Sequence, residues 1–293
     1  MWFNHALIYQ YELDTPNELN DLLAADPLKP CPPHARFIYG WKPMIGTQFV
    51  HEVTGASLFC LGKEERLLPR SVIQRLIEEQ IETLETQRGY PVKRAEKMRL
   101  MEELEFQLLP KAFCLQKSLL ALFDHLNKRL MINTTSLTQT AQLTSLLRKS
   151  APSIHIEPFK YPEHAAARLT TWVTHPETLP PAFQLASNCM LIAPDNEQKR
   201  VQCKGYELPA DEVLTLLKQG LAVAELSLVW QERIEFTLTQ DFTFKRLKRL
   251  DYLIDEYNDI RQLNESAAEK DAELILLTGE WRALLHDLMG AFT

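Results

Sequence analysis

Two consecutive helical patterns between residues 71 and 106 constrain the fold of this chain more than any other feature. From residue 71 to about residue 88, the apolar residues that recur at helical spacing among charged ones are Val72, Leu76, Ile77, Ile81 and Leu84. Gly89-Tyr90-Pro91 breaks this pattern, and a second charged helix is predicted over residues 92–106. We therefore predict a helical arm over residues 71–106.

Strand-like runs and further helical patterns lie on both sides of the arm. Residues 6–11, 36–41 and 56–62 predict strands, and residues 119–123 and 130–134 predict a β-hairpin followed by a helix over 136–149. A strand near 190–193, a helix after Pro209 and a long two-stranded hairpin over 225–249, turning near Gln240-Asp241, are predicted next. Helices over 251–260 and 267–292 close the chain. The predicted fold class is α+β.

These elements group into two interleaved parts. The N-terminal α/β part comprises residues 1–70 and 107–180, with the helical arm between its two segments. The C-terminal α+β part comprises residues 181–293. A chain of 293 residues is long enough to bury a substantial core and to divide in this way.

The composition argues against membrane, secreted and nucleotide-binding proteins. No uninterrupted apolar run reaches the roughly eighteen residues that a spanning helix needs. The five cysteines are odd in number and widely spaced, which favours free thiols in a reducing cytosol. Nine glycines leave few places where the backbone can crowd a phosphate. We expect a cytoplasmic protein.

The net charge of −7 hides an asymmetry along the chain. Residues 251–293 contain ten acidic and three basic residues, whereas residues 1–250 contain 29 of each. The C-terminal segment therefore carries the whole deficit, and the remainder has room for local basic patches. A concentrated patch, rather than the average charge, decides whether a protein can bind nucleic acid.

Motifs for catalysis or metal binding are not found in the sequence. Gly55 and Gly62-Lys63 lack the spacing of a phosphate loop, and Glu64 follows where a Ser or Thr would bind magnesium. His51-Glu52 is followed by Gly55 where a zinc-protease helix needs a second histidine, and Cys31 and His34 have no second pair. We therefore expect no enzymatic activity, no cofactor and no metal. A hydrolase whose site is assembled from scattered His and Asp residues remains an alternative.

The first basic cluster lies in the predicted arm. Between residues 88 and 99 the candidate DNA-binding bases are Lys93, Arg94, Lys97 and Arg99. Helical spacing places Lys97 on the same side as Lys93 and Arg94, where like charges repel each other by a few tenths of a kcal/mol. The alternative is a solvated helix face balanced by the acids of residues 78–85.

The second basic cluster follows Phe242-Thr243-Phe244 and contains Lys245, Arg246, Lys248 and Arg249. In a strand, alternation would place Arg246 and Lys248 on one face and Lys245 and Arg249 on the other. Bases stacked along a sheet suit duplex DNA, which carries a phosphate charge about every 1.7 Å of its axis. The alternative is that these bases pair with acids of the following helix, such as Asp255 and Glu256.

Several segments also carry a family resemblance over nearly the whole chain, in collinear order. They are Lys63-Glu64-Glu65-Arg66-Leu67-Leu68-Pro69, Leu108-Leu109-Pro110-Lys111-Ala112-Phe113, Leu146-Leu147-Arg148-Lys149-Ser150, Trp230-Gln231-Glu232-Arg233-Ile234-Glu235-Phe236 and Ala272-Glu273-Leu274-Ile275-Leu276-Leu277-Thr278-Gly279-Glu280. Together with the basic run around Leu247, they resemble the RdgC family of bacterial recombination-associated proteins. The likeness is weakest over residues 181–201.

The resemblance implies a crescent-shaped subunit, two of which close into a homodimeric ring around duplex DNA. It also implies sequence-independent DNA binding, with single-stranded DNA as a further ligand, nucleoid association and restraint of RecA-driven strand exchange. Carried over by position, Lys111 and Phe113 would lie where two subunits close the ring, and Gln202 would face that junction. A ring needs only nonspecific phosphate contacts inside, so its exterior can be acidic.

A different class of function also fits the charge pattern. The acidic C-terminal helices could belong to a scaffold protein that binds a protein partner. Binding to unrelated DNA duplexes would distinguish the two, because a scaffold would bind none of them. A deep pocket lined with titratable groups would instead favour the hydrolase.

Overall fold

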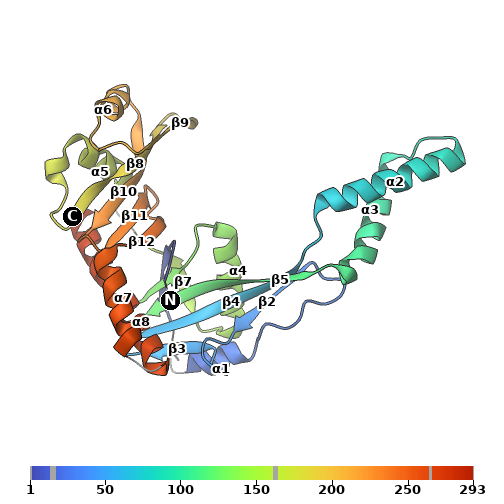
Figure 1. Ribbon diagram of the computed structural model, residues 1–293, viewed down its shortest axis with the longest axis horizontal. Helices are drawn as coiled ribbons and strands as arrows, with labels where there is room; N and C mark the ends of the chain where they lie inside the picture. The colour runs from blue at the N-terminus through green and yellow to red at the C-terminus, as the bar shows by residue number, and fades with distance from the viewer. Residues whose placement is uncertain (1, 14–17, 161–163, 264–265, 293) are drawn as a thin grey trace.

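The computed structural model describes residues 2–13, 18–160, 164–263 and 266–292. Within these ranges the strands form two antiparallel sheets, one of seven strands (sheet 1) and one of five (sheet 2), with helices packed around both. Sheet 2 rises at an angle from one end of sheet 1, so the molecule is bent (Figure 1). The predicted α+β class is confirmed.

Sheet 1 is built from the first half of the chain. Its strands are β1 (Leu7–Glu12), β2 (Phe37–Lys42), β3 (Val50–Val53), β4 (Ala56–Arg66), β5 (Cys114–Asp124), β6 (Arg129–Ile132) and β7 (His155–Pro158). Their order is β2-β4-β5-β6-β1-β7, and β3 also pairs with β4. The predicted hairpin is confirmed as β5–β6, with Leu122 opposite Met131.

Strand alternation gives sheet 1 two buried faces. On one face, Phe59 and Phe123 pack with the helices α1 (Leu19–Ala24) and α4 (Leu137–Ser150). On the other face, Leu58 and Leu122 belong to the core cluster that includes the C-terminal helix. Both faces are therefore covered, and strands β4 and β5 read as nearly continuous apolar runs in their buried parts.

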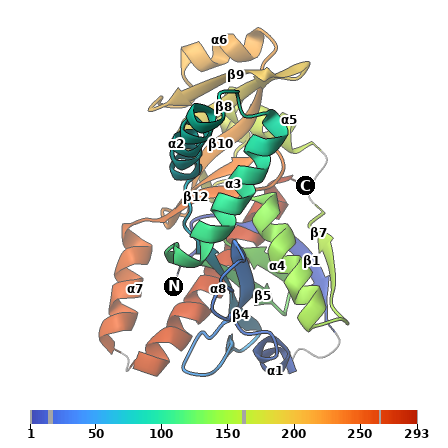
Figure 2. The same ribbon diagram turned by 90° about the vertical axis from the view of Figure 1, so that its right-hand side faces the viewer.

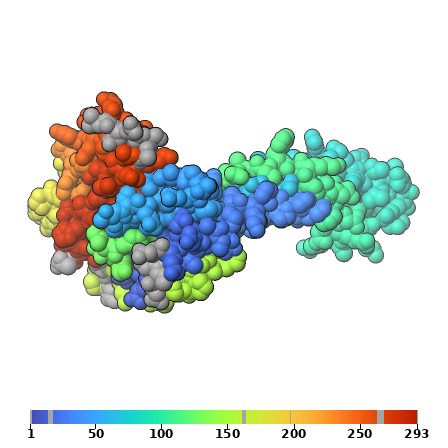
Figure 3. All heavy atoms as spheres, turned by 90° about the horizontal axis from the view of Figure 1, so that it is seen from below, coloured from blue at the N-terminus to red at the C-terminus, as the bar shows by residue number. Residues whose placement is uncertain are grey.

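The arm leaves the end of sheet 1 that is formed by β2, β4 and β5 (Figure 1) and projects from the rest of the molecule (Figure 3). The helices α2 (Arg70–Arg88) and α3 (Arg94–Leu108) occupy the two segments predicted to be helical, and the 3-10 turn η2 (Leu109–Lys111) follows. Gly89 ends α2 with φ of +74°, a backbone conformation that glycine adopts readily. A small cluster of Ile73, Ile77 and Leu104 holds the two helices together.

Sheet 2 comes from the second half of the chain. Its strands are β8 (Phe183–Ala193), β9 (Asn196–Lys204), β10 (Ala222–Trp230), β11 (Ile234–Thr239) and β12 (Phe244–Arg249), in the order β12-β11-β10-β8-β9. The predicted turn near Gln240-Asp241 is confirmed between β11 and β12. The prediction of a single two-stranded hairpin over 225–249 is wrong, because the segment contains three strands. The missed turn places Gln231 and Glu232 at φ of +46° and +54°. Sequence reasoning looks for Gly, Asn or Asp at such positions, so this turn gave no signal.

The remaining helices pack mainly around sheet 2. They are α5 (Ala165–Thr174), the 3-10 turn η3 (Pro176–Thr178), α6 (Asp211–Lys218), α7 (Asp251–Leu263) and α8 (Ser266–Phe292). The two closing helices predicted from the sequence are thus confirmed. Helix α8 spans about 40 Å and buries a stripe at helical spacing that includes Leu277, Trp281, Leu284 and Leu288.

One arginine ties both closing helices to sheet 2. Arg233, in the turn between β10 and β11, donates from Nε to both oxygens of Glu280 on α8, at 3.1 and 3.0 Å. Its Nη2 also donates to Glu256 on α7. The Glu280 side chain is 90% buried, so its carboxylate depends on this partner.

We expect Arg233→Ala to lower the free energy of unfolding by about 3 kcal/mol, because it leaves a buried carboxylate without its cation. Chemical denaturation measures this change. Arg99→Ala, which removes a pair with Glu103 that is largely exposed, is the matched control and should cost less than about 1 kcal/mol. Equal losses in the two variants would contradict the anchoring role of Arg233.

Candidate nucleic-acid interface

Sheet 2 has one covered face and one open face. Helices α5 and α8 pack on the first, with Leu226, Leu228 and Trp230 in the shared core. The other face is turned toward the concave side of the bent molecule, the side from which the arm extends (Figures 1 and 2). We call it the open face. Strand register and alternation place on it Arg200, Gln202 and Lys204 of β9, Met190 of β8, Glu225 of β10, Glu235 of β11, and Lys245 and Lys248 of β12.

The predicted alternation of the basic strand is wrong. Lys248 lies opposite Glu235 and Lys245 lies opposite Thr237, so the register shifts by one residue between them. Arg246 sits in this bulge with φ of +54°, and Leu247 turns into the core. Lys245 and Lys248 therefore share the open face, instead of lying on opposite faces. A one-residue bulge reverses the phase of a strand, and strand periodicity alone does not reveal it.

The four bases of β12 differ in their partners. Lys245 pairs with Glu225 at 2.7 Å, and Lys248 approaches Glu235 at 3.4 Å. Arg249 stacks its guanidinium 4.4 Å from the ring centroid of Tyr257 and 5.5 Å from that of Trp2. The alternative of pairing with Asp255 and Glu256 is thus not what the structure contains.

Arg246 and Lys248 are the exposed bases of this strand, and within the described ranges no acidic side chain forms an ion pair with Arg246. Its backbone N–H donates to Nδ1 of His5 at 3.3 Å. Burial, and then the charges of Lys245 and Arg246, lower the pKa of His5. The imidazole therefore stays neutral near pH 7 and can keep accepting this bond, which holds the bulge in place.

Sequence reasoning missed a basic edge strand at the other side of the open face. On β9, Arg200, Gln202 and Lys204 point to the same side, and all three are exposed. Arg200 and Lys204 have no ion-pair partner among the described residues. The bases at 200 and 204 share one side at the strand period of two and could have signalled the basic strand, but most of it lies within residues 181–201, where the family likeness is weakest.

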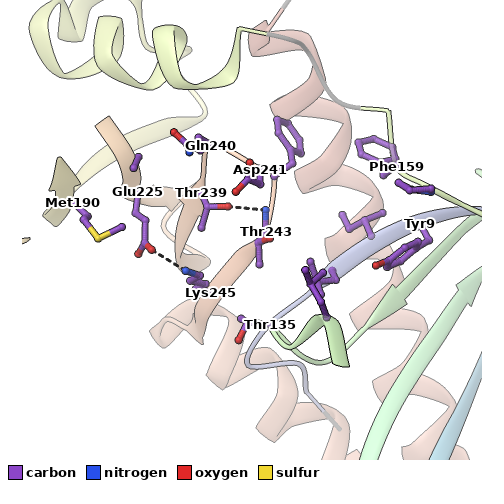
Figure 4. A pocket seen from close by; sticks show the side chains of 16 residues that line it. Tyr9, Thr135, Phe159, Met190, Glu225, Thr239, Gln240, Asp241, Thr243 and Lys245 are labelled. Atoms are coloured by element: carbon purple, nitrogen blue, oxygen red, sulfur yellow. Dashed lines mark hydrogen bonds and ion pairs between the residues drawn. The ribbon is translucent and has the colours of Figure 1, made fainter. Parts of the chain in front are cut away.

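A cleft of about 490 Å³ opens where the two sheets meet on the concave side. Met190, Glu225 and Lys245 line it from sheet 2, and Tyr9 and Phe159 line it from sheet 1 (Figure 4). The ion pair between Glu225 and Lys245 forms part of the wall of the cleft. The cleft continues the open face down to the edge of sheet 1, so the concave surface is continuous from one sheet to the other.

The bases predicted on the arm lie near the start of α3. Lys93, Arg94 and Arg99 are exposed, and Arg99 pairs with Glu103 at 3.2 Å. Lys97 is half-buried and lines the groove between α2 and α3 with Met98. The cluster is therefore divided, and it lies on the arm, away from the open face (Figure 1). Its role in DNA binding stays a prediction.

The base of the arm displays Phe113, which is 85% exposed. Arg66 organises the backbone beneath it by donating from Nη1 to the carbonyls of Leu109 and Ala112, at 3.1 and 3.3 Å, and from Nη2 to that of Cys31 at 3.0 Å. Lys111 is also exposed. The alternative that Phe113 is a core residue of its own subunit is excluded by its exposure.

Lys111 and Phe113 do not meet Gln202 within one chain. Gln202 lies on β9, at the end of sheet 2 that is far from sheet 1, whereas Lys111 and Phe113 lie where the arm joins sheet 1 (Figure 1). A junction between these residues can form only between two chains. The predicted ring-closing role of all three stays a prediction.

The acidic C-terminal helices lie on the outer side of the bend, opposite the open face (Figure 1). Many of their acids have structural partners: Glu256 and Glu280 bind Arg233, Glu269 pairs with Arg261, and Asp271 pairs with His51 at 2.7 Å. Many of the acidic residues that make residues 251–293 negatively charged thus form ion pairs that attach the helices. The rest remain on the side away from the open face.

Neither metal-binding clusters nor membrane spans appear in the parts of the chain that the structure describes. No three His, Cys, Asp or Glu side chains there gather closely enough to hold a metal ion. None of the described helices combines the length and apolar character needed to cross a bilayer.

The architecture defines a class of bent, two-sheet α+β proteins with a helical arm and an open sheet face edged by bases. A family model described as "Putative exonuclease, RdgC" matches residues 1–293. The chain belongs to the RdgC family, as the sequence resemblance predicted. The recombination-associated protein RdgC of Pseudoalteromonas translucida is 33% identical over 294 residues, covering 98% of this chain and 96% of that protein. The protein of the same name from Salmonella typhimurium is 32% identical, with coverages of 99% and 97%.

We expect Phe113→Ser to leave the midpoint of thermal unfolding almost unchanged, within about 2 °C, because an exposed side chain loses little packing when truncated. Differential scanning calorimetry under conditions that keep the protein monomeric measures it. Phe123→Ser, at a fully buried phenylalanine on β5, is the control and should unfold the protein or lower its midpoint by more than about 10 °C.

Proposed function

We propose that this chain binds duplex DNA without sequence preference through its open face, as one half of a homodimeric ring, and thereby restrains RecA-driven strand exchange. The observation that carries the proposal is the open face itself. None of the described helices covers it, and it faces the concave side of the bent molecule together with sheet 1. Exposed bases lie along both of its edges.

The arrangement of the bases favours phosphate contacts over base readout. Arg200 and Lys204 stand on one edge strand, and Arg246 and Lys248 stand on the other. On β12 itself, Lys245 pairs with Glu225 at 2.7 Å and Lys248 approaches Glu235 at 3.4 Å. Two separated rows of cations suit the two phosphate backbones of a duplex, and such contacts carry no sequence information.

The exposed apolar side chain of Phe113 at the base of the arm supports the proposed ring. Phe113, at 85%, is the most exposed large apolar side chain among the described residues, and aromatic side chains are enriched at the centres of protein interfaces. Lys111 beside it provides a polar rim, which is typical of reversible interfaces. A closed ring would hold DNA by topology, so weak phosphate contacts inside it would suffice.

Restraint of recombination then needs no turnover. A protein that coats or encircles duplex DNA denies the recombinase filament access to it. The relatives named recombination-associated proteins support this direction. The family model's description names exonuclease activity as another candidate. End-labelled duplex incubated with the protein and Mg²⁺ or Mn²⁺ distinguishes the two, because our proposal requires the label to stay in full-length strands.

We expect the double variant Arg246→Ala with Lys248→Ala to weaken binding to all duplexes alike and to reduce the slope of log affinity against log salt by about two. Fluorescence anisotropy with unrelated duplexes over a salt series measures both quantities. Arg168→Ala with Lys270→Ala removes the same charges from α5 and α8, on the other side of sheet 2, and should leave the slope unchanged. If both double variants behave like the parent, the bases of β12 do not contact the DNA.

We expect a stable homodimer in solution, with an apolar contact through Phe113 at one of its junctions. Equilibrium sedimentation should give twice the chain mass of 33.9 kDa at micromolar concentration. Phe113→Ser should shift the distribution toward monomer and shorten retention on circular DNA. A parent protein that sediments only as a single chain would contradict the ring.

A further inference from the structure

Two cysteines face each other across the outermost pair of strands in sheet 2. Cys189 on β8 lies directly opposite Cys203 on β9 in the register of the ladder. Directly opposed residues of antiparallel strands have Cα atoms about 4.5 or 5.5 Å apart. Disulfides form at Cα separations of about 4.4–6.8 Å, so the Cα spacing of this pair lies in the range of a disulfide.

The two thiols are shielded and lie against each other. Cys189 is 3% exposed and Cys203 is 5% exposed, and both side chains point into the core beneath the sheet. Burial, and then the neighbouring Cys203 thiol, raise the pKa of Cys189 to about 12. A protonated, buried thiol reacts slowly, so oxidation requires opening of the strand that covers it.

Strand β9 can open because it is an edge strand. It pairs only with β8 in the sheet, and its pairing is irregular near the turn, between Ile192 and Ala193. The other described cysteines are not opposed across strands: in the ladder Cys60 faces Lys42 and Leu120, and Cys114 faces Arg66, while its neighbour Cys31 lies outside the strands. The cross-strand geometry is therefore specific to Cys189 and Cys203.

We propose that Cys189 and Cys203 form a reversible redox pair that staples the edge strand β9 to sheet 2 under oxidation by a hydroperoxide. One thiol attacks the peroxide and becomes a sulfenic acid, with release of water or the corresponding alcohol. The second thiol attacks the sulfenic sulfur, forms the S–S bond and releases water. The two thiols lose two protons and two electrons, and the peroxide is reduced. A dithiol reductant reverses the bond by exchange.

A disulfide between Cys189 and Cys203 would restrain β9, which also carries exposed residues. Arg200, Gln202 and Lys204 lie on the opposite side of β9 from Cys203 and belong to the open face. Closing a loop of about 15 residues restricts the opened state of this hairpin, so the amides of β9 should open ten- to 100-fold less often. The redox pair goes beyond the proposed DNA binding and does not depend on it.

The test uses the full chain, treated with hydrogen peroxide under native conditions and digested without reduction. Peptide mass mapping should recover a Cys189–Cys203 linkage that dithiothreitol removes. Hydrogen exchange should show at least about tenfold stronger protection of β9 amides in the linked form. Cys203→Ser should abolish the linkage and this gain, whereas Cys60→Ser, at an equally buried cysteine, should preserve both.

Two outcomes would overturn the proposal. One is a linkage that appears only after unfolding in denaturant, or no linkage with oxidation confined to the exposed Cys114. The other is a linkage in the folded chain without any change in β9 exchange. Both readouts on the parent protein stand even if Cys203→Ser fails to fold.

Discussion

Helix α8 lies against both sheets, and the relative placement of the sheets depends on its contacts. At sheet 1, Arg282 donates to Asp124 Oδ1 at 2.9 and 2.7 Å and to the carbonyl of Gly55 at 2.7 Å. At sheet 2, Asp287 accepts from the indole of Trp230 at 2.9 Å, and Glu280 binds Arg233. The buried stripe between these anchors joins the cores of the two sheets into one cluster. Since α8 occupies the outer side of the bend, the inner face of sheet 2 is left open.

This arrangement separates two kinds of charge. The acids of α7 and α8 lie on the outer side of the bend, and several of them form ion pairs with Arg233, Arg261 and His51. The bases of β9 and β12 lie at the two edges of the open face. A net charge of −7 is therefore compatible with a cationic inner surface, because the field near a surface depends on local charges when salt screens distant ones.

The base of the arm shows how a hydrogen-bond network around one arginine can present an exposed residue. The guanidinium of Arg66 donates hydrogen bonds to the carbonyls of residues 31, 32, 109, 110 and 112, and these bonds hold the backbone around Phe113. The side chain of Phe113 then points outward on a rigid support. Sequence pattern suggested an interface residue here only through the family resemblance, because a lone phenylalanine in a Leu-Leu-Pro-Lys-Ala-Phe segment gives no indication of its exposure.

The sequence by itself determined the α+β class, the two helices of the arm, the β5–β6 hairpin and the closing helices, because these rest on local periodicity and on breaks such as Gly89-Tyr90-Pro91. It also carried the family through collinear motifs. Only the tertiary structure decided which bases share a surface. The bulge at Arg246 reversed the phase of β12, the turn at Gln231-Glu232 lacked a turn residue, and the bases of β9 joined the open face through pairing with β8. Each of these depends on backbone twist and strand register, which are set by contacts between distant segments.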